Sequence, residues 1–248
     1  MSGHPAIAFD KVCKTYSMAW HMAGGIKGLV LRPGEALRRM RQVEREVLHD
    51  VSFAVATGES VGIIGRNGVG KSTILALIAG VLRPSSGTVR VHGRVAPLLE
   101  LGAGFHPELT GRDNILLNGV LLGMRRREVA AKADDIIAFA ELADSIDEPI
   151  RVYSSGMVSR LGFAVAVHLE PEVLLIDESL TVGDAPFQEK CIAKIAELHA
   201  RGVTTLLVSH DLGSVERLCD RAMVLEARHI AFTGPPDEAV AFYRMGMQ

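Results

Sequence analysis

The sequence predicts an α/β protein in which a mostly parallel sheet is covered by helices. Short β-rich runs alternate along the chain with segments of helical spacing. Most of these runs are almost continuously apolar, which is typical of strands buried on both faces of a parallel sheet. The chain has 248 residues, 48% of them hydrophobic, which is enough for one large core. The predicted strands are residues 61–65, 88–93, 173–177, 204–210 and 222–227.

The N-terminal region contains two further strand-like segments, residues 6–12 and 47–55. The insertion between them, residues 17–46, is rich in basic side chains, and its second half (33–47) has the pattern of a basic amphipathic helix. Two interpretations stay open: a solvated surface insertion, or a surface that meets a membrane partner or anionic lipid. The basic residues are Lys27, Arg32, Arg38, Arg39, Arg41 and Arg45.

Residues 65–72, GRNGVGKS, match the phosphate-loop pattern GxxxxGK[ST] in full. The motif follows a predicted strand and precedes a helical run, which is the context that it requires. Glycines let successive N–H groups converge on phosphate oxygens, and the helix N-terminus adds positive potential. We expect Lys71 to reach the β- and γ-phosphates of ATP, and the Ser72 hydroxyl to bind Mg²⁺. The candidate nucleotide-binding residues of this loop are Gly65, Asn67, Gly68, Gly70, Lys71, Ser72 and Thr73.

Two other predicted strands end in residues suited to the same chemistry. The run 173–176 is followed by Asp177 and Glu178. The carboxyl ends of parallel strands share one edge of the sheet, so Asp177 can hold Mg²⁺ through its water shell and Glu178 can orient the attacking water. The alternative is a helix N-cap. His210 ends the run 204–210 within reach of a γ-phosphate, with a structural role as its alternative.

Residues of about 101–169 have helical spacing and no comparable strand, which predicts a helical lobe inserted into the α/β core. We expect a single domain spanning residues 1–248, because the chain shows no linker, internal repeat or low-complexity tract.

Composition excludes several classes of protein. A net charge of −2, from 27 basic and 29 acidic residues, argues against a sequence-independent nucleic-acid binder. Cys13, Cys191 and Cys219 lack the spacing of metal ligands and are expected to be small core or surface residues in a reducing compartment. The N-terminus lacks the pattern of a signal peptide, and the apolar runs are shorter than the roughly 20 residues of a membrane helix.

Taken together, these motifs and their order resemble the nucleotide-binding subunits of ABC transporters over essentially the whole chain. The signature sequence of that family, commonly LSGGQ, corresponds here to YSSGM at 153–157. Ser154 and Gly156 match its serine and second glycine, with a helix expected from Val158 onward. The resemblance implies a P-loop ATPase core with an antiparallel β-subdomain and a helical subdomain. It also implies a homodimer in which the signature of one copy faces the γ-phosphate held by the other.

Other residue roles are implied by the same resemblance. Tyr16 corresponds to the aromatic residue that stacks on adenine, with a buried core residue as the alternative. Asp184 corresponds to an aspartate at the dimer contact, and His210 to the switch histidine. A glutamine that senses Mg²⁺ and the membrane subunit is missing, and either Glu100 or His106 takes its place.

Within the family, the chain resembles the branch that exports cell-surface polysaccharide, such as O-antigen, capsule and teichoic acid. The segments that carry this likeness are YSSGM, ELGAGFHPELTGRDNI, IDESLTVGDAPF and the insertion after Tyr16. The resemblance implies two transmembrane permease subunits, a lipid-linked polysaccharide as cargo, no nucleic acid, and a peripheral location at the cytoplasmic face of the inner membrane. Some members carry an additional C-terminal carbohydrate-binding domain; a chain that needs none and a truncated chain are both open.

Three other functions are weaker alternatives. A soluble ABC ATPase acting on ribosomes or DNA would normally have two cassettes or long coiled coils. An importer or drug-exporter subunit would favour a regular LSGGQ and a recognisable glutamine. A non-catalytic regulator would not need Lys71, Asp177, Glu178 and His210 together.

Overall fold

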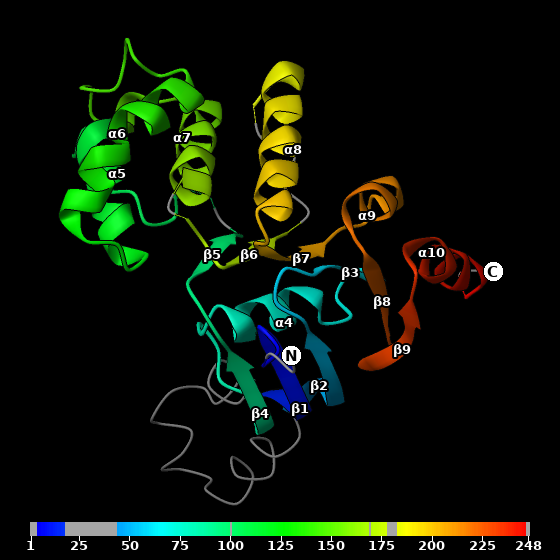
Figure 1. Cartoon of the computed structure of the whole chain (residues 1–248). Helices are drawn as coiled ribbons and strands as arrows, with labels where there is room; N and C mark the ends of the chain where they lie inside the picture. Colours follow the sequence, from blue (N-terminus) through cyan, green and yellow to red (C-terminus); the bar gives the residue numbers. More distant parts are fainter. Residues whose placement is uncertain (1–3, 18–43, 100, 169, 178–182, 247–248) are drawn as a thin grey trace, which may run out of the picture.

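The computed structural model describes residues 4–17, 44–99, 101–168, 170–177 and 183–246. Its main sheet has six strands in the order β5-β6-β7-β3-β8-β9 (Figure 1). Neighbouring strands are parallel, except that β9 is antiparallel to β8. The predicted mostly parallel α/β core is therefore confirmed. The strands are β3 (Ser60–Ile64), β5 (Val95–Leu98), β6 (Val173–Ile176), β7 (Thr204–Val208), β8 (Arg221–Glu226) and β9 (His229–Gly234).

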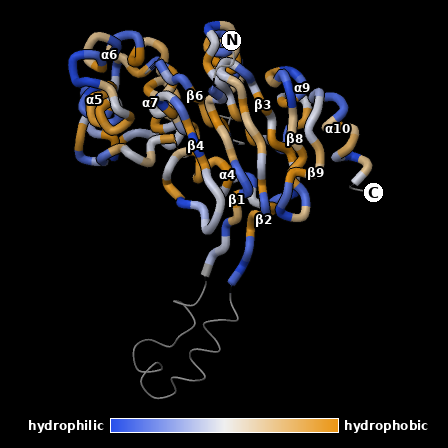
Figure 2. Tube along the Cα trace, turned by 60° about the horizontal axis from the view of Figure 1, so that its bottom comes forward, coloured by the Kyte–Doolittle hydropathy of each residue, from blue (hydrophilic) through white to orange (hydrophobic). Residues whose placement is uncertain are grey.

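The central strands are buried on both faces, as their apolar sequences predict. In β6, Leu174 and Ile176 pack on one face of the sheet, while Val173 and Leu175 pack on the other. Figure 2 shows hydrophobic positions recurring along the central strands. Because helices cover both faces of the sheet, a ligand can reach it at the carboxyl ends of the strands, where the loops begin.

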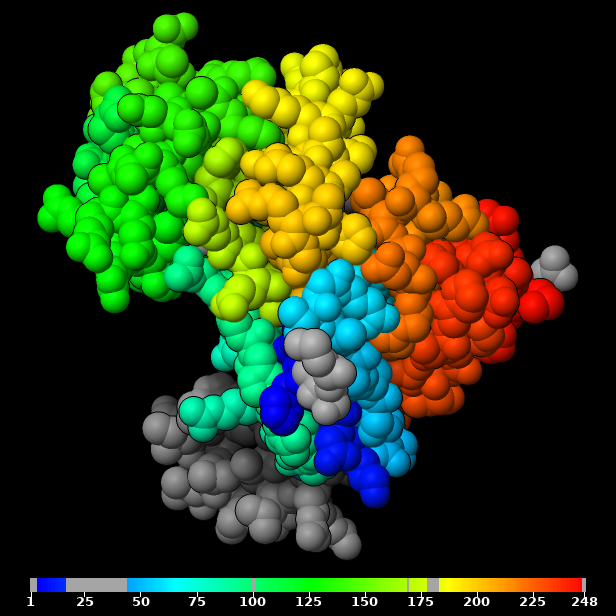
Figure 3. All heavy atoms as spheres, viewed as in Figure 1, coloured from blue at the N-terminus to red at the C-terminus, as the bar shows by residue number. Residues whose placement is uncertain are grey.

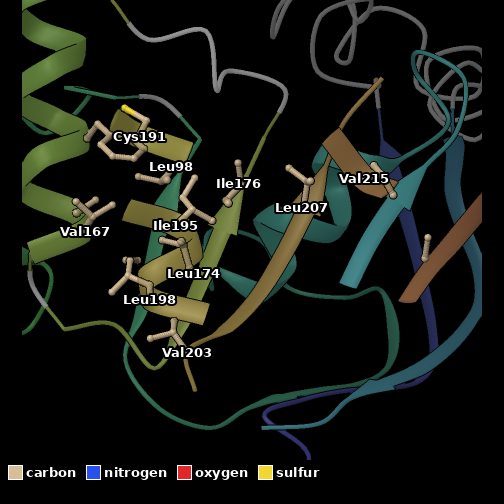
Figure 4. Close-up of a cluster of buried hydrophobic side chains, with 14 of the residues drawn as sticks. Leu98, Val167, Leu174, Ile176, Cys191, Ile195, Leu198, Val203, Leu207 and Val215 are labelled. Carbon is tan, nitrogen blue, oxygen red and sulfur yellow. The ribbon is translucent and has the colours of Figure 1, made fainter. Parts of the chain in front are cut away.

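Helices cover the two faces unequally. The helices α8 (Ala185–Ala200), α9 (Leu212–Leu218) and α10 (Pro236–Met245) lie on one face, and α4 (Lys71–Ile78) lies on the other (Figure 1). Figure 4 shows the first of these cores, where Ile195 and Leu198 of α8 meet Leu174 and Ile176 of β6. On the opposite face, Ile74 and Leu75 of α4 enter the second core.

A separate antiparallel sheet has the order β2-β1-β4 and adjoins the second core. Its strands are β1 (Ile7–Ser17), β2 (Glu44–Val55) and β4 (Ser86–Val91). Pairing of β1 with β2 begins at Ser17 and Glu44, across the base of the insertion. The expected helix over 33–47 is wrong for 44–47, because ladder pairing extends β2 to Glu44; the rest of it lies outside the described residues.

The predicted helical subdomain consists of α5 (Gly111–Leu121), α6 (Arg126–Ala140), the short 3₁₀ helix η1 (Ile150–Val152) and α7 (Ser155–His168). These helices enclose a third hydrophobic core that includes Ile136, Ile146 and Leu161. The boundaries at about 101–169 and the extent of the single domain stay predictions. Among the described residues, no helix is both long enough and apolar enough to cross a membrane.

Candidate nucleotide-binding site

The predicted phosphate-binding and catalytic segments follow three adjacent strands of the main sheet. Parallel β6, β7 and β3 lie side by side, with Ile176 opposite Leu207 and Ile63 opposite Val208. Their carboxyl ends are therefore nearly level, and Asp177, His210 and the phosphate loop leave the sheet at one edge. This is the edge where open α/β sheets bind ligands. The structure thus brings together three segments that are far apart in the sequence.

The phosphate loop needs glycine at Gly65 and Gly70 for reasons visible in the packing. A Cβ on Gly65 would lie 2.5 Å from the Leu225 carbonyl oxygen of β8. Gly70 has φ 121°, and a Cβ there would lie 2.9 Å from Leu48 Cδ2 and 3.1 Å from the Val47 carbonyl oxygen. A side chain at Gly65 would force the loop or β8 to move, and one at Gly70 would add backbone strain at a positive φ.

Lys71 is 6% exposed, and its ammonium contacts the backbone of the loop. Its Nζ donates to the carbonyl oxygens of Gly65 at 2.8 Å and Arg66 at 3.2 Å. Ser72 and Asn67 are exposed, while Thr73 is half-buried. The described first turn of α4 carries no acidic residue, so nothing on it neutralises the positive end of the helix. A cation, backbone N–H groups at a helix start and hydroxyls are the donor set that a triphosphate needs.

The turn that carries His210 is fixed by its neighbours, while His210 itself is exposed. The Asp211 N–H donates to Ser209 Oγ at 3.0 Å, and the Asp211 carboxylate caps α9 by accepting from the Gly213 N–H at 3.1 Å. Asp177 is half-buried at the end of β6. Glu178, the expected water-orienting residue, lies outside the described residues, so its role stays a prediction.

A second feature is a hollow of about 540 Å³ between the N-terminal ends of α7 and α8. The signature residues Ser154 and Gly156 and the distant Asp184 all line this hollow, a proximity that the sequence alone could not show. The hollow is lined by Ser154, Ser155, Gly156, Met157, Ser159, Arg160, Gly183 and Asp184.

The local backbone of the signature differs from the expectation. The helix begins at Ser155 and not at Val158, because Ser154 Oγ accepts from the Met157 N–H at 3.2 Å and so caps the helix. Ser155 and Gly156 are therefore in its first turn, where N–H groups are available to an anion. Tyr153 is buried, and its hydroxyl donates to the Ser145 carbonyl oxygen at 2.6 Å.

Comparison with known proteins identifies the family. Residues 48–181, which include the phosphate loop and the signature, match the family model described as ABC transporter. The chain belongs to the ABC transporter family.

Relatives within this family support the predicted branch. A Klebsiella pneumoniae protein named O-antigen export system ATP-binding protein RfbB is 51% identical over 98% of this chain and 99% of the relative. A protein of Listeria innocua named Teichoic acids export ATP-binding protein TagH is 42% identical over 96% of this chain and 69% of its own length. The predicted resemblance to ATPase subunits for polysaccharide export is confirmed.

Solved ABC structures share the fold. The ATP-binding subunit of an ABC transporter superposes with a TM-score of 0.78 at 22% identity, covering 98% of this chain and 99% of its own. A dimeric ATP-binding cassette bound to ADP and Pi, MJ0796, gives 0.73 at 21% identity, covering 93% of this chain and 98% of its own. These likenesses confirm the predicted ABC ATPase fold.

Tyr16 lies on β1 and is not part of a hydrophobic core. It is 37% exposed and paired with Arg45 across the antiparallel sheet, and the Lys14 ammonium lies 5.2 Å from its ring centroid. The core alternative is therefore wrong, and the stacking of adenine on this ring stays a prediction.

The position of the missing family glutamine stays open between Glu100 and His106. Glu100 lies outside the described residues, whereas exposed His106 accepts from the Glu108 N–H at 3.3 Å through Nδ1. The sequence did not predict the role of Asn114, a fully buried residue that stabilises this loop. Its Oδ1 accepts from the His106 N–H at 2.7 Å, and its Nδ2 donates to the carbonyl oxygens of His106, Leu109 and Thr110. The helix-start pattern Thr110–Asp113 was the available signal for this turn.

Proposed function

We propose that this chain is the ATP-hydrolysing subunit of an ABC transporter that exports lipid-linked cell-surface polysaccharide. The cargo class is that of O-antigen, capsule or teichoic acid. The convergence of the phosphate loop, Asp177 and His210 on adjacent strand ends carries the ATPase function. The full-length likeness to O-antigen export subunits supports the direction and cargo of transport.

The chemistry that we propose is positioning and charge stabilisation around the γ-phosphoryl group of ATP. Lys71 compensates charge on the β- and γ-phosphates, His210 contacts the γ-phosphate, and Glu178 orients the attacking water. Ser72 and Asp177 would hold Mg²⁺, and their hydroxyl and carboxylate oxygens are ligands that this ion prefers. Bound Mg²⁺ neutralises charge that develops on the phosphate oxygens. Tyr16 stacks on adenine.

A homodimer is part of the proposal, because the signature hollow and the phosphate loop belong to elements on opposite faces of the main sheet (Figure 1). One chain therefore offers both an ATP-binding loop and, elsewhere, an anion-accepting helix start at Ser154–Gly156. Two copies arranged head to tail would close each nucleotide between the two features, with Asp184 at the contact.

Two transmembrane permease subunits would receive the closing and opening of this dimer at the cytoplasmic face of the inner membrane. The segment 17–46 is the proposed contact with them or with anionic lipid, on the basis of its basic side chains. The described chain would thus be a peripheral motor subunit.

The deciding experiment is depletion of this subunit from its native cell, followed by separate extraction of inner-membrane and surface glycan. Accumulation of lipid-linked polysaccharide on the cytoplasmic side, with loss from the surface, is the expected result. An unchanged distribution in a cell without a compensating paralogue would refute the cargo and leave only the ABC ATPase.

A further inference from the structure

The carboxylate of Glu141 contacts both α7 and α8, the helices whose N-terminal ends border the signature hollow. Glu141 ends α6 in the left-handed conformation, with φ 57°. Its Oε2 accepts from Arg160 Nη2 of α7 at 2.7 Å, and its Oε1 accepts from Lys190 Nζ of α8 at 3.1 Å. One side chain therefore ties together three helices.

Each of the two cations makes further contacts with the same helix end. Arg160 Nε donates to the Ala140 carbonyl oxygen at 3.0 Å, and Lys190 Nζ donates to that of Phe139 at 2.8 Å. These carbonyl groups form the negative C-terminal end of the α6 dipole, and the nearby cations stabilise that end of the helix.

Each of the two cations also lies close to an aromatic ring. The Arg160 guanidinium lies 4.9 Å from the Phe187 ring centroid, and Lys190 Nζ lies 4.7 Å from that of Phe139. Since Phe187 is in the first turn of α8, Arg160 contacts both the end of α6 and the beginning of α8. Its position is therefore determined by several independent contacts.

The helices held in this way carry the two halves of the hollow. Helix α7 begins just after Ser154, and α8 begins just after Asp184. Arg160 itself lines the hollow beside Gly183, where a Cβ would come within 3.4 Å of Arg160 Cδ. Figures 1 and 3 show α7 and α8 side by side. A change in the spacing of these helices would separate Ser154 from Asp184.

We propose that Glu141, Arg160 and Lys190 form a positioning cluster that presents Ser154 and Asp184 together to the nucleotide held by a second copy of the chain. This inference rests on the proposed ATPase dimer. The phosphate loop connects the end of β3 to α4, and α4 packs on the face of the sheet opposite α7 and α8. The cluster therefore acts on association and turnover but not on ATP binding by one copy. Glu141 has 54% of its side chain exposed, and ion pairs at such exposure contribute little to folding stability.

The test compares Glu141→Ala with Glu197→Ala. Glu197 is a matched control, because its side chain is 50% exposed and pairs with Lys194 and Arg201 along α8 itself. We expect Glu141→Ala to raise the protein concentration for half-maximal ATPase rate about tenfold, the factor that corresponds to about 1.4 kcal/mol. Its ATP affinity, measured by calorimetry in dilute protein, should stay within about twofold of wild type. Glu197→Ala should match wild type in both.

A second variant guards against misfolding of the first. Arg160→Lys keeps the charge beside Glu141 but loses the planar fork that reaches Ala140 as well, and a smaller shift of the ATPase concentration dependence is expected. The inference is overturned if Glu141→Ala and Arg160→Lys both behave like Glu197→Ala. It is also overturned if ATP affinity and thermal midpoint fall in parallel with the rate, as a purely structural role would require. A wild-type chain without ATPase activity at any concentration would instead overturn the proposed function.

Discussion

At the residue scale, Gly70 combines a backbone constraint with a steric one. Its φ of 121° disfavours any side chain, and Leu48 and the Val47 carbonyl fill the space where a Cβ would lie. We predict that Gly70→Ala weakens ATP binding about tenfold or more, because the loop must shift to relieve both constraints. Gly80→Ala is the control: φ there is 73°, but no atom lies within 4 Å of the Cβ. Calorimetry that found equal affinities for the two variants would contradict this account.

His168 gives the described structure a pH-dependent stability. Its pKa lies below the usual 6.5, chiefly because burial disfavours the charged imidazolium; Lys194 and Lys132 act in the same direction, whereas the Ala164 carbonyl and Asp135 oppose them. The unfolded chain therefore binds the proton more tightly, and stability is lost as the pH falls below about 6.5 toward the folded pKa.

The matching variant is His168→Gln, whose amide can still donate to the Ala164 carbonyl oxygen that His168 Nδ1 contacts at 2.8 Å. We predict a smaller loss of stability between pH 7.5 and 5.5 in the variant than in wild type, both measured by urea unfolding. An equal loss in both proteins would assign the pH dependence to other groups.

Residues that act through a local pattern were predictable, and those that act through tertiary contacts were not. The phosphate loop and Asp177 follow apolar strands in the sequence, so their edge of the sheet could be inferred before the fold was known. Asn114 had a local signal only in the helix-start pattern Thr110–Asp113. Glu141 and Arg160 carry no such pattern, because their partners lie 19 to 49 residues away, as for Lys190 and Glu141. Only packing of the helices reveals their roles.

At the element scale, the N-terminus of α8 links helix stability to the hollow. Asp184 caps α8 by accepting from the Phe187 N–H at 3.1 Å. Asp184→Ala should lower the free energy of unfolding by about 1 kcal/mol, the usual effect of losing an N-cap. Asp184→Asn keeps a cap acceptor but removes the charge, so it should retain wild-type stability.

The two variants separate the roles of Asp184. If its charge serves the dimer contact, both should lower the ATPase rate, although only Asp184→Ala should lower the urea midpoint. A wild-type rate for Asp184→Asn would restrict Asp184 to capping.

Elements missed from the sequence have weak local signals. Strand β5 spans only Val95–Leu98 and contains Pro97, which disfavours central strands, yet it pairs with β6 at the end of the sheet order. Strand β9 is only partly buried and needs β8 to define its register. Strands β3, β6 and β7 were clear because both their faces are buried.

At the scale of the whole molecule, the antiparallel sheet supports the phosphate loop from the side. Leu48 of β2 is fully buried in the second core with Ile74 and Leu75 of α4, and it is also the residue against which Gly70 packs. We therefore expect nucleotide binding to depend on the β1–β2 pair and not on the segment that joins the two strands.

This division predicts the effect of replacing residues 18–43 with an Asn-Gly turn. Ser17 and Glu44 are directly opposite in the β1–β2 register, so a two-residue hairpin turn can close the strands. We expect wild-type ATP affinity and cooperative unfolding, but loss of surface polysaccharide in cells that depend on the variant.

A companion variant changes only the basic residues of the segment, Lys27, Arg32, Arg38, Arg39 and Arg41, to Gln. Each such charge near an anionic membrane is worth about 1 kcal/mol, so reduced export by this variant would assign the role to charge. Normal export with the Asn-Gly turn would show that the segment is a solvated surface insertion.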